Sequence, residues 1–113
     1  MGAAIRTHVV LLGDSTFDNK FYVGKGNQSI IEQLTDKTFE KGWNASSVAV
    51  DGQAMCHIRT QLERIPPDAT HLVISIGGND ALAYMQRLNQ EVKSVAEGAI
   101  VLNEILKEFE KVF

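Results

Sequence analysis

Three short clusters of small polar residues contain the side chains in this sequence that could do chemistry. They are Gly13-Asp14-Ser15, Asp51-Gly52 and Gly77-Gly78-Asn79-Asp80. Acyl transfer from an ester needs a nucleophile, a base that takes its proton, and hydrogen-bond donors for the oxyanion. Ser15 is the candidate nucleophile. The candidate oxyanion donors are the backbone N–H of Ser15, the backbone N–H of Gly52 and the side-chain amide of Asn79.

Each cluster follows a short apolar run that predicts a β-strand. The runs cover residues 8–12, 47–50 and 71–76. Continuous Val, Leu and Ile without polar alternation are typical of strands buried on both faces of a parallel sheet. The carboxyl ends of parallel strands share one edge, where open α/β sheets place their ligands. We therefore expect the three clusters to meet at that edge.

Helical patterns lie between and after these runs. Residues 29–41 and 55–65 each carry one apolar face at helical spacing. A third pattern starts at Ala81 and continues, with a break near Asn89, to Phe113. The resulting order, β-α-β-α-β-α, predicts right-handed crossovers and a parallel sheet.

The last helical pattern carries two adjacent apolar rows. One row repeats every three or four residues from Val92 to Phe113, and the second row consists of Val101, Ile105 and Val112. A helix that packs on a three-stranded sheet uses only one such row. The second row therefore predicts that this side of the helix is covered, either by a further part of the same chain or by a partner chain.

Length and composition are those of one folded domain over residues 1–113. Hydrophobic residues make up 44% of the 113 residues, which is enough for a core. The single cysteine, Cys56, excludes an internal disulfide and so a disulfide-built secreted scaffold. The net charge of −3, with acidic and basic residues interspersed, argues against a nucleic-acid partner.

The sequence shows no sign of a membrane span or a leader. No apolar segment approaches the roughly 20 residues that a membrane-spanning helix needs. The N-terminus lacks the hydrophobic region of a signal peptide. We therefore expect a cytoplasmic protein, or one from which a leader has been removed.

The three clusters resemble sequence blocks of the SGNH, or GDSL-type, hydrolases. Residues 13–19, Gly-Asp-Ser-Thr-Phe-Asp-Asn, resemble the first block, whose serine is the nucleophile. Gly52 stands where the family has its second-block glycine, and residues 77–80 resemble the third block, G-x-N-D. The resemblance covers essentially the whole chain. It implies a flavodoxin-like three-layer α/β/α sandwich with a parallel sheet, and hydrolysis of small-molecule esters without a metal or organic cofactor.

The sequence departs from this family in one respect. The family's fifth block, D-x-x-H, supplies the base and its orienting acid near the C-terminus, and the sequence after the third block contains no counterpart. The resemblance is therefore to the N-terminal part of the family fold, with about three strands and with the C-terminal part missing. Two sources of a base stay open, His57 and a partner chain. His8 and His71 fall at the amino ends of their predicted strands, away from Ser15.

Each candidate residue also has a structural interpretation. Ser15 and the Asn79-Asp80 pair could be helix N-caps, Gly52 a plain turn, and His57 a surface residue in a first helical turn. Found together at three strand ends, Ser15, Gly52 and Asn79 favour the functional interpretation. The residues that we expect to support the loops through local hydrogen bonds are Asp14, Asp18, Asn19 and Asp80.

Two functions of other classes are open at the level of sequence. The first is a catalytically inactive α/β module that associates with itself. In the strand order 2-1-3-4-5, loss of strands four and five leaves strand three as a bare apolar edge, which invites pairing with another chain. We therefore expect a homodimer or a higher homo-oligomer. The second, a phosphate-binding domain, is disfavoured because the three clusters contain no Lys or Arg.

Overall fold

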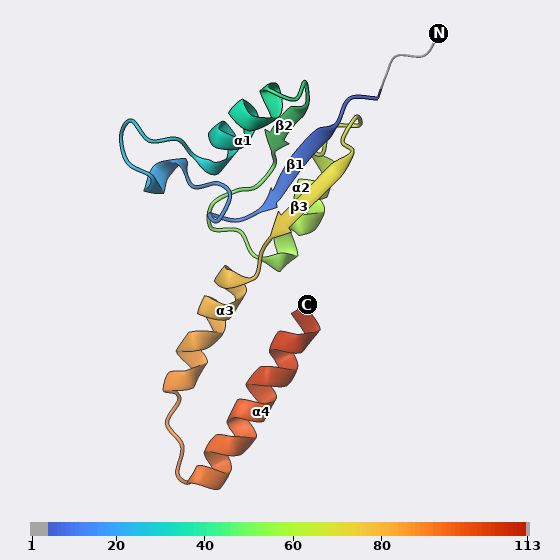
Figure 1. Ribbon diagram of the computed structural model, residues 1–113. Helices are drawn as coiled ribbons and strands as arrows, with labels where there is room; N and C mark the ends of the chain where they lie inside the picture. The colour runs from blue at the N-terminus through green and yellow to red at the C-terminus, as the bar shows by residue number, and fades with distance from the viewer. Residues whose placement is uncertain (1–4, 113) are drawn as a thin grey trace.

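The computed structural model describes residues 5–112 and contains a three-stranded sheet, helices that flank it and a pair of C-terminal helices (Figure 1). The strands are β1 (His8–Gly13), β2 (Asn44–Ser47) and β3 (His71–Ser75). The α-helices are α1 (Ile30–Phe39), α2 (Ile58–Glu63), α3 (Gly78–Met85) and α4 (Val95–Val112). Short 3-10 helices are η1 (Lys20–Tyr22), η2 (Met55–His57) and η3 (Gln86–Asn89).

The sheet is parallel, with the order β2-β1-β3, so the predicted α/β topology is confirmed. Its central strand supplies the most deeply buried apolar side chains, which are at most 3% exposed and belong to Val10, Leu11 and Leu12. Within the described residues β3 is an open edge of the sheet. Its apolar side chains are half-exposed: Leu72 at 47%, Val73 at 43% and Ile74 at 52%. The bare apolar edge expected from the sequence is therefore present.

Two helices flank the sheet. α1 packs against β2, and α2 packs against β1. The crossovers from β1 to β2 and from β2 to β3 run in opposite directions, so right-handed connections place the two helices on opposite faces. Figure 1 shows α2 behind β1 and β3. This arrangement brings the amino end of each following helix or turn to the carboxyl edge of the sheet.

The second strand begins earlier than the sequence predicted. It covers Asn44–Ser47 rather than 47–50, because pairing with β1 starts at the first residue of that strand, His8. The apolar residues beyond it still run alongside β1, since the N–H groups of Val48 and Val50 donate to Leu11 O (2.9 Å) and Gly13 O (3.1 Å). The extended chain therefore continues to the carboxyl edge.

α1 is fixed at both ends by backbone and side-chain hydrogen bonds. Ser29 caps its start: the Ser29 hydroxyl accepts the N–H of Glu32 (3.3 Å), and Glu32 accepts the N–H of Ser29 (3.1 Å). At the other end the N–H of Trp43 donates to Thr38 O (2.9 Å) after Gly42, whose φ is +72°. The helix is thus two residues shorter than predicted at its C-terminal end.

The C-terminal helices leave the sheet as a hairpin (Figure 1). The predicted break near Asn89 is confirmed, since η3 ends there and α4 begins at Val95. α4 packs against α3, where the rings of Tyr84 and Phe109 meet edge to face at 5.6 Å. The radius of gyration is 19.3 Å, against about 13 Å for a compact chain of this length.

Most of the apolar surface of α4 remains uncovered by this hairpin. Ile105 is buried, whereas Leu102 and Leu106 are 56% and 55% exposed. The two apolar rows predicted from the sequence are thus only partly used, and Phe113 lies outside the described residues. None of the helices among residues 5–112 combines the length and hydrophobicity that crossing a membrane requires.

Candidate active site

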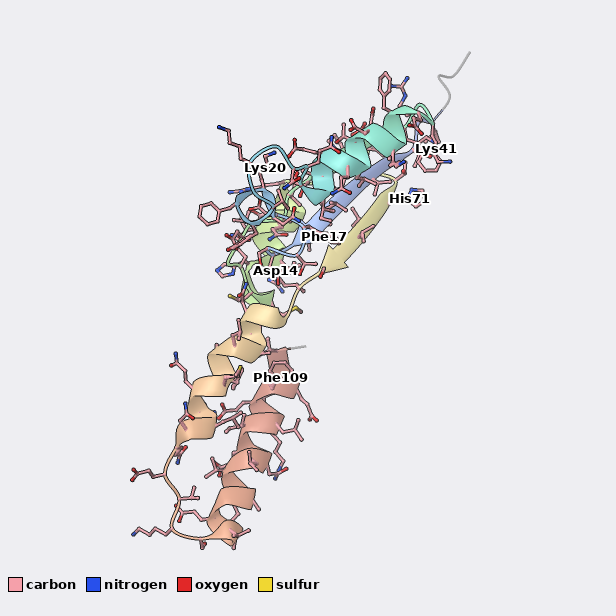
Figure 2. The ribbon with its side chains drawn as sticks, turned by 60° about the vertical axis from the view of Figure 1, so that its left-hand side comes forward. Asp14, Phe17, Lys20, Lys41, His71 and Phe109 are labelled. Carbon is pink, nitrogen blue, oxygen red and sulfur yellow. The ribbon has the colours of Figure 1, made fainter. Side chains whose placement is uncertain are left out.

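The three polar clusters meet at the carboxyl edge of the sheet, as the parallel topology requires. Figure 2 shows Asp14 and Phe17 at this edge, and His71 and Lys41 at the opposite end of the sheet. Gly13 of β1 lies opposite Ser75 of β3, so the first and third clusters start from neighbouring strands.

Ser15 lies in a tight turn that Asp14 organises. The carbonyl oxygen of Asp14 accepts the N–H groups of Phe17 (3.1 Å) and Asp18 (2.9 Å), and its side-chain Oδ1 accepts the N–H of Thr16 (3.0 Å). Asp14 is 5% exposed. Within residues 5–112, none of the hydrogen bonds of this turn uses the N–H of Ser15. That N–H therefore remains a potential donor.

Only glycine fits at position 13, where β1 passes into this turn. Gly13 has a φ of +137°, and a Cβ built on it would lie 1.8 Å from the backbone oxygen of Ser75. The backbone of β1 therefore approaches β3 closely just before Ser15. A side chain at position 13 would push apart the two strands that bring the first and third clusters together.

The second cluster is tied to the first by side chains from the loop after Ser15. Asp18 Oδ2 accepts the N–H of Asp51 at 2.7 Å, and the hydroxyl of Tyr22 donates to Asp51 Oδ2 at 2.7 Å. The hydrogen bond to Asp51 raises the pKa of Tyr22 above its ordinary value of 10.0. Asn19 holds the same loop to α1, since its Oδ1 accepts the N–H of Ile30 at 2.9 Å. Asp18 and Asn19 thus brace the loop.

Gly52 turns the second loop with a φ of +84°, and a Cβ built there would meet nothing within 4 Å. Its neighbours are engaged, since the N–H of Asp51 donates to Asp18 and that of Gln53 donates to Val50 O (3.2 Å). No hydrogen bond among the described residues uses the N–H of Gly52. The N–H of Gly52 is therefore a second potential donor beside open space.

The third cluster is joined to the second through two side chains in the first turn of α3. Asn79 Nδ2 donates to the backbone oxygen of Gln53 at 2.9 Å, one residue after Gly52. Asp80, which is 9% exposed, accepts the N–H of Met55 on its Oδ2 at 2.9 Å. An amide nitrogen carries two N–H groups, so Asn79 has a second donor in addition to the one that holds the loop.

The chain was compared with protein families, with curated proteins and with solved structures. Scanned against models of protein families, the chain matches none, and a search of curated proteins gives no match. Among solved structures it is similar to AlinE4, an SGNH-hydrolase family esterase, with a TM-score of 0.53 and 23% sequence identity. Two point variants of the same esterase match equally well. The chain has the fold of an SGNH hydrolase.

The structural similarity covers a larger share of this chain than of the esterase. It takes in 97% of this chain and 56% of the esterase chain, so the chain spans little more than half the length of these SGNH structures. The α/β fold expected from the sequence is confirmed by this structural similarity.

Gln61 of α2 is a positioning residue in this SGNH fold that the sequence reasoning missed. It is 1% exposed, its Oε1 accepts the N–H of Gly13 (2.8 Å), and its Nε2 donates to Gly13 O (2.7 Å) and Gln53 Oε1 (2.7 Å). It thus joins the ends of the first and second clusters. The available signal was its position beside Leu62, on the face of α2 otherwise marked by apolar residues.

His57 is exposed in η2, near the second cluster. Its Nδ1 accepts the N–H of Ala54 at 2.9 Å. In the neutral ring the proton then sits on Nε2, so the one acceptor nitrogen is already in use. This geometry disfavours His57 as the base for Ser15. Within the part of the chain that the structure describes, no group of three or more His, Cys, Asp or Glu residues could hold a metal ion.

Proposed function

We propose that this chain is part of a serine ester hydrolase in which Ser15 is the nucleophile. The backbone N–H groups of Ser15 and Gly52 and the side-chain amide of Asn79 would bind the oxyanion of the tetrahedral intermediate. Attack by the Ser15 hydroxyl on the ester carbonyl would release the alcohol and leave an acyl-enzyme, which water then hydrolyses. The substrate would be a small-molecule ester, and the activity belongs to the complete protein.

One observation carries this proposal: the three strand-end loops are joined by hydrogen bonds into one cluster that includes the turn with Ser15. Asp51 is held by Asp18, Gln53 by Asn79, and Gly13 by Gln61. In that cluster the N–H groups of Ser15 and Gly52 enter no hydrogen bond with the described residues, whereas the N–H groups beside them do. Donors left unused in an otherwise bonded loop are suited to an incoming oxyanion. The fold likeness to an SGNH esterase supports the same chemistry.

We do not assign the base to a described residue, because the acceptor nitrogen of His57 is already used by the N–H of Ala54. A serine hydroxyl without a base is a weak nucleophile, although an oxyanion site and substrate binding can retain part of the catalysis. We propose that the base comes from a chain segment or partner that packs beside Ser15.

The test is covalent labelling followed by mapping of the modified residue. A fluorophosphonate reagent is expected to modify Ser15, and the Ser15→Ala variant should lose that modification. Thr16→Ala is the matched control, because it removes the neighbouring exposed hydroxyl and should leave labelling unchanged. Turnover of p-nitrophenyl acetate should fall in Ser15→Ala and not in Thr16→Ala. Absence of label from Ser15 in the folded protein would refute the assignment.

A second candidate function, self-association without catalysis, is favoured by the open edge of β3. Three consecutive apolar side chains there are 43–52% exposed, beside unpaired backbone groups of an edge strand. We propose that two copies pair through β3 or through the uncovered apolar surface of α4 in a homodimer or larger oligomer.

Sedimentation velocity tests this second candidate at micromolar concentration. We expect a dimer or larger species that becomes monomeric when Ile74→Lys places a charge on the edge. Lys37→Ala, an exposed change on α1 away from β3, is the control and should leave the oligomer intact. A stable monomer of the unaltered chain would exclude this function.

A further inference from the structure

His8 bridges a serine and an aspartate at the amino edge of the sheet. Its Nε2 lies 2.7 Å from the hydroxyl oxygen of Ser46, and its Nδ1 lies 3.0 Å from Oδ1 of Asp68. The His8 side chain is 8% exposed and that of Asp68 is 65% exposed. These residues come from β1, β2 and the loop before β3. They lie at the opposite end of β1 from Ser15.

For a neutral imidazole, the chemistry of the three groups sets the direction of both hydrogen bonds. An ionised carboxylate only accepts, so the proton of the neutral imidazole must be on Nδ1. His8 Nε2 is then an acceptor, and the Ser46 hydroxyl must be the donor. A serine that donates to a histidine whose other nitrogen is held by a carboxylate has the hydrogen bonding of an activated nucleophile.

The backbone holds His8 in this position from two sides, through Thr70, the residue before β3, and through β2. The N–H of His8 donates to Thr70 Oγ1 at 2.8 Å, and the N–H of Thr70 donates to His8 O at 3.0 Å. On the other side His8 is in register with Asn44 at the start of β2, two residues before Ser46. The imidazole is therefore placed by the sheet itself rather than by a mobile loop.

A cavity opens next to this group. It has a volume of about 340 Å³ and is lined by His8 and Ser46 together with Thr35, Phe39, Trp43 and Asn44. The volume is in the range of small-molecule sites. The two aromatic side chains favour a flat apolar group, and the side-chain amide of Asn44 is a hydrogen-bond donor.

We propose that Ser46, His8 and Asp68 form a second acyl-transfer site, independent of Ser15, that takes small aryl esters. Ser46 Oγ attacks the ester carbonyl carbon, and its proton passes to His8 Nε2. The carbon–oxygen bond to the leaving group then breaks, and the phenol departs with the proton from Nε2, which leaves an acyl group on Ser46. Water reverses the same proton transfers and releases the acid. Asp68 is a positioning residue that holds the imidazole, and the Asn44 amide donates to the oxyanion.

The test maps fluorophosphonate labelling across the chain. The reagent is expected to modify Ser46, and Ser46→Ala removes that modification. Ser47→Ala, at the next position of β2, is the control and retains it, and Ser15→Ala also retains the label on Ser46. This last arm separates the second site from the proposed site at Ser15, because each label can be absent while the other is present.

The role of Asp68 is tested at an exposed position, where substitution leaves the core unaltered. Asp68→Asn is expected to slow the labelling of Ser46 about tenfold or more, because the carboxylate no longer fixes the proton on Nδ1. Asp68→Glu should restore much of the rate, a rescue that a purely structural role does not predict. No label on Ser46 in the folded protein, or an unchanged rate in Asp68→Asn, would overturn the proposal.

Discussion

The side-chain carboxamide of Gln61 makes two hydrogen bonds with the backbone of Gly13. Its Oε1 accepts the N–H of Gly13 at 2.8 Å, and its Nε2 donates to Gly13 O at 2.7 Å. The residue that ends β1 is thus fixed by a side chain from α2, the helix of the crossover from β2 to β3. The position of Ser15, two residues after Gly13, depends on this contact.

Replacing Gln61 by leucine should destabilise the protein by about 1–3 kcal/mol, because it leaves the buried N–H of Gly13 without a partner. Denaturant unfolding followed by circular dichroism measures this loss. Thr60→Leu, an exposed change in the same helix, is the control and should cost little. An equal, small effect of both substitutions would show that the hydrogen bonds to Gly13 contribute little.

Gly13→Ala should destabilise the protein more than the addition of a single methyl group would suggest. The added Cβ would lie 1.8 Å from Ser75 O at a φ of +137°, so β1 and β3 must move apart. We expect a loss of at least about 2 kcal/mol in unfolding free energy. Gly26→Ala is the matched control, since it also has a positive φ (+83°) but a Cβ there meets nothing within 4 Å. Similar losses in both variants would mean that φ alone, and not the contact with Ser75, sets the cost.

The sheet could be predicted because its signals are local. The apolar runs before Gly13 and Gly77 can be satisfied only by strands that are buried or paired, and right-handed crossovers then fix the order β2-β1-β3. The meeting of the three clusters follows from this topology alone. The start of β2 at Asn44 could not be read in the same way, since pairing with β1 and not hydrophobicity sets it.

The side-chain contacts of Gln61 and His8 could not be predicted from the sequence, for a different reason. Gln61 and His8 act through partners that are far away in the chain, and nothing in their sequence neighbourhood identifies Gly13 or Ser46 as those partners. The hairpin of α3 and α4 was missed as well. Its apolar rows have the same periodicity whether the helix packs on the sheet or on another helix.

Asn79→Ala should slow the labelling of Ser15 by fluorophosphonate about 100-fold if the amide is an oxyanion donor. The same substitution removes the hydrogen bond from Nδ2 to Gln53 O, so unfolding must be measured in parallel. Asn103→Ala, an exposed change on α4, is the control. A labelling rate that stays within twofold of the unaltered chain would remove Asn79 from the oxyanion site.

The start of α1 should respond to acid through Glu32. A hydrogen bond and ion pair with Lys20, whose Nζ lies 2.8 Å from Glu32 Oε1, is the largest cause that lowers the pKa of Glu32 from its ordinary 4.5 to about 2. The hydrogen bonds with Ser29 add to it. Because the folded-state pKa is lower than the unfolded one, the charged form stabilises the fold above pH 4.5, and this contribution is lost as the pH falls toward 2.

Glu32→Gln removes that charge, while its amide oxygen can still accept the N–H of Ser29. The variant therefore isolates the contribution of the negative charge to stability. The variant should melt at a lower temperature than the unaltered chain at pH 7, and the two melting curves should converge as the pH approaches 2. Added salt should narrow the difference at pH 7, because both side chains of the pair are more than 40% exposed. Glu63→Gln on α2 serves as the control. A difference in melting temperature that does not change between pH 7 and pH 2 would show that the charge of Glu32 does not stabilise α1.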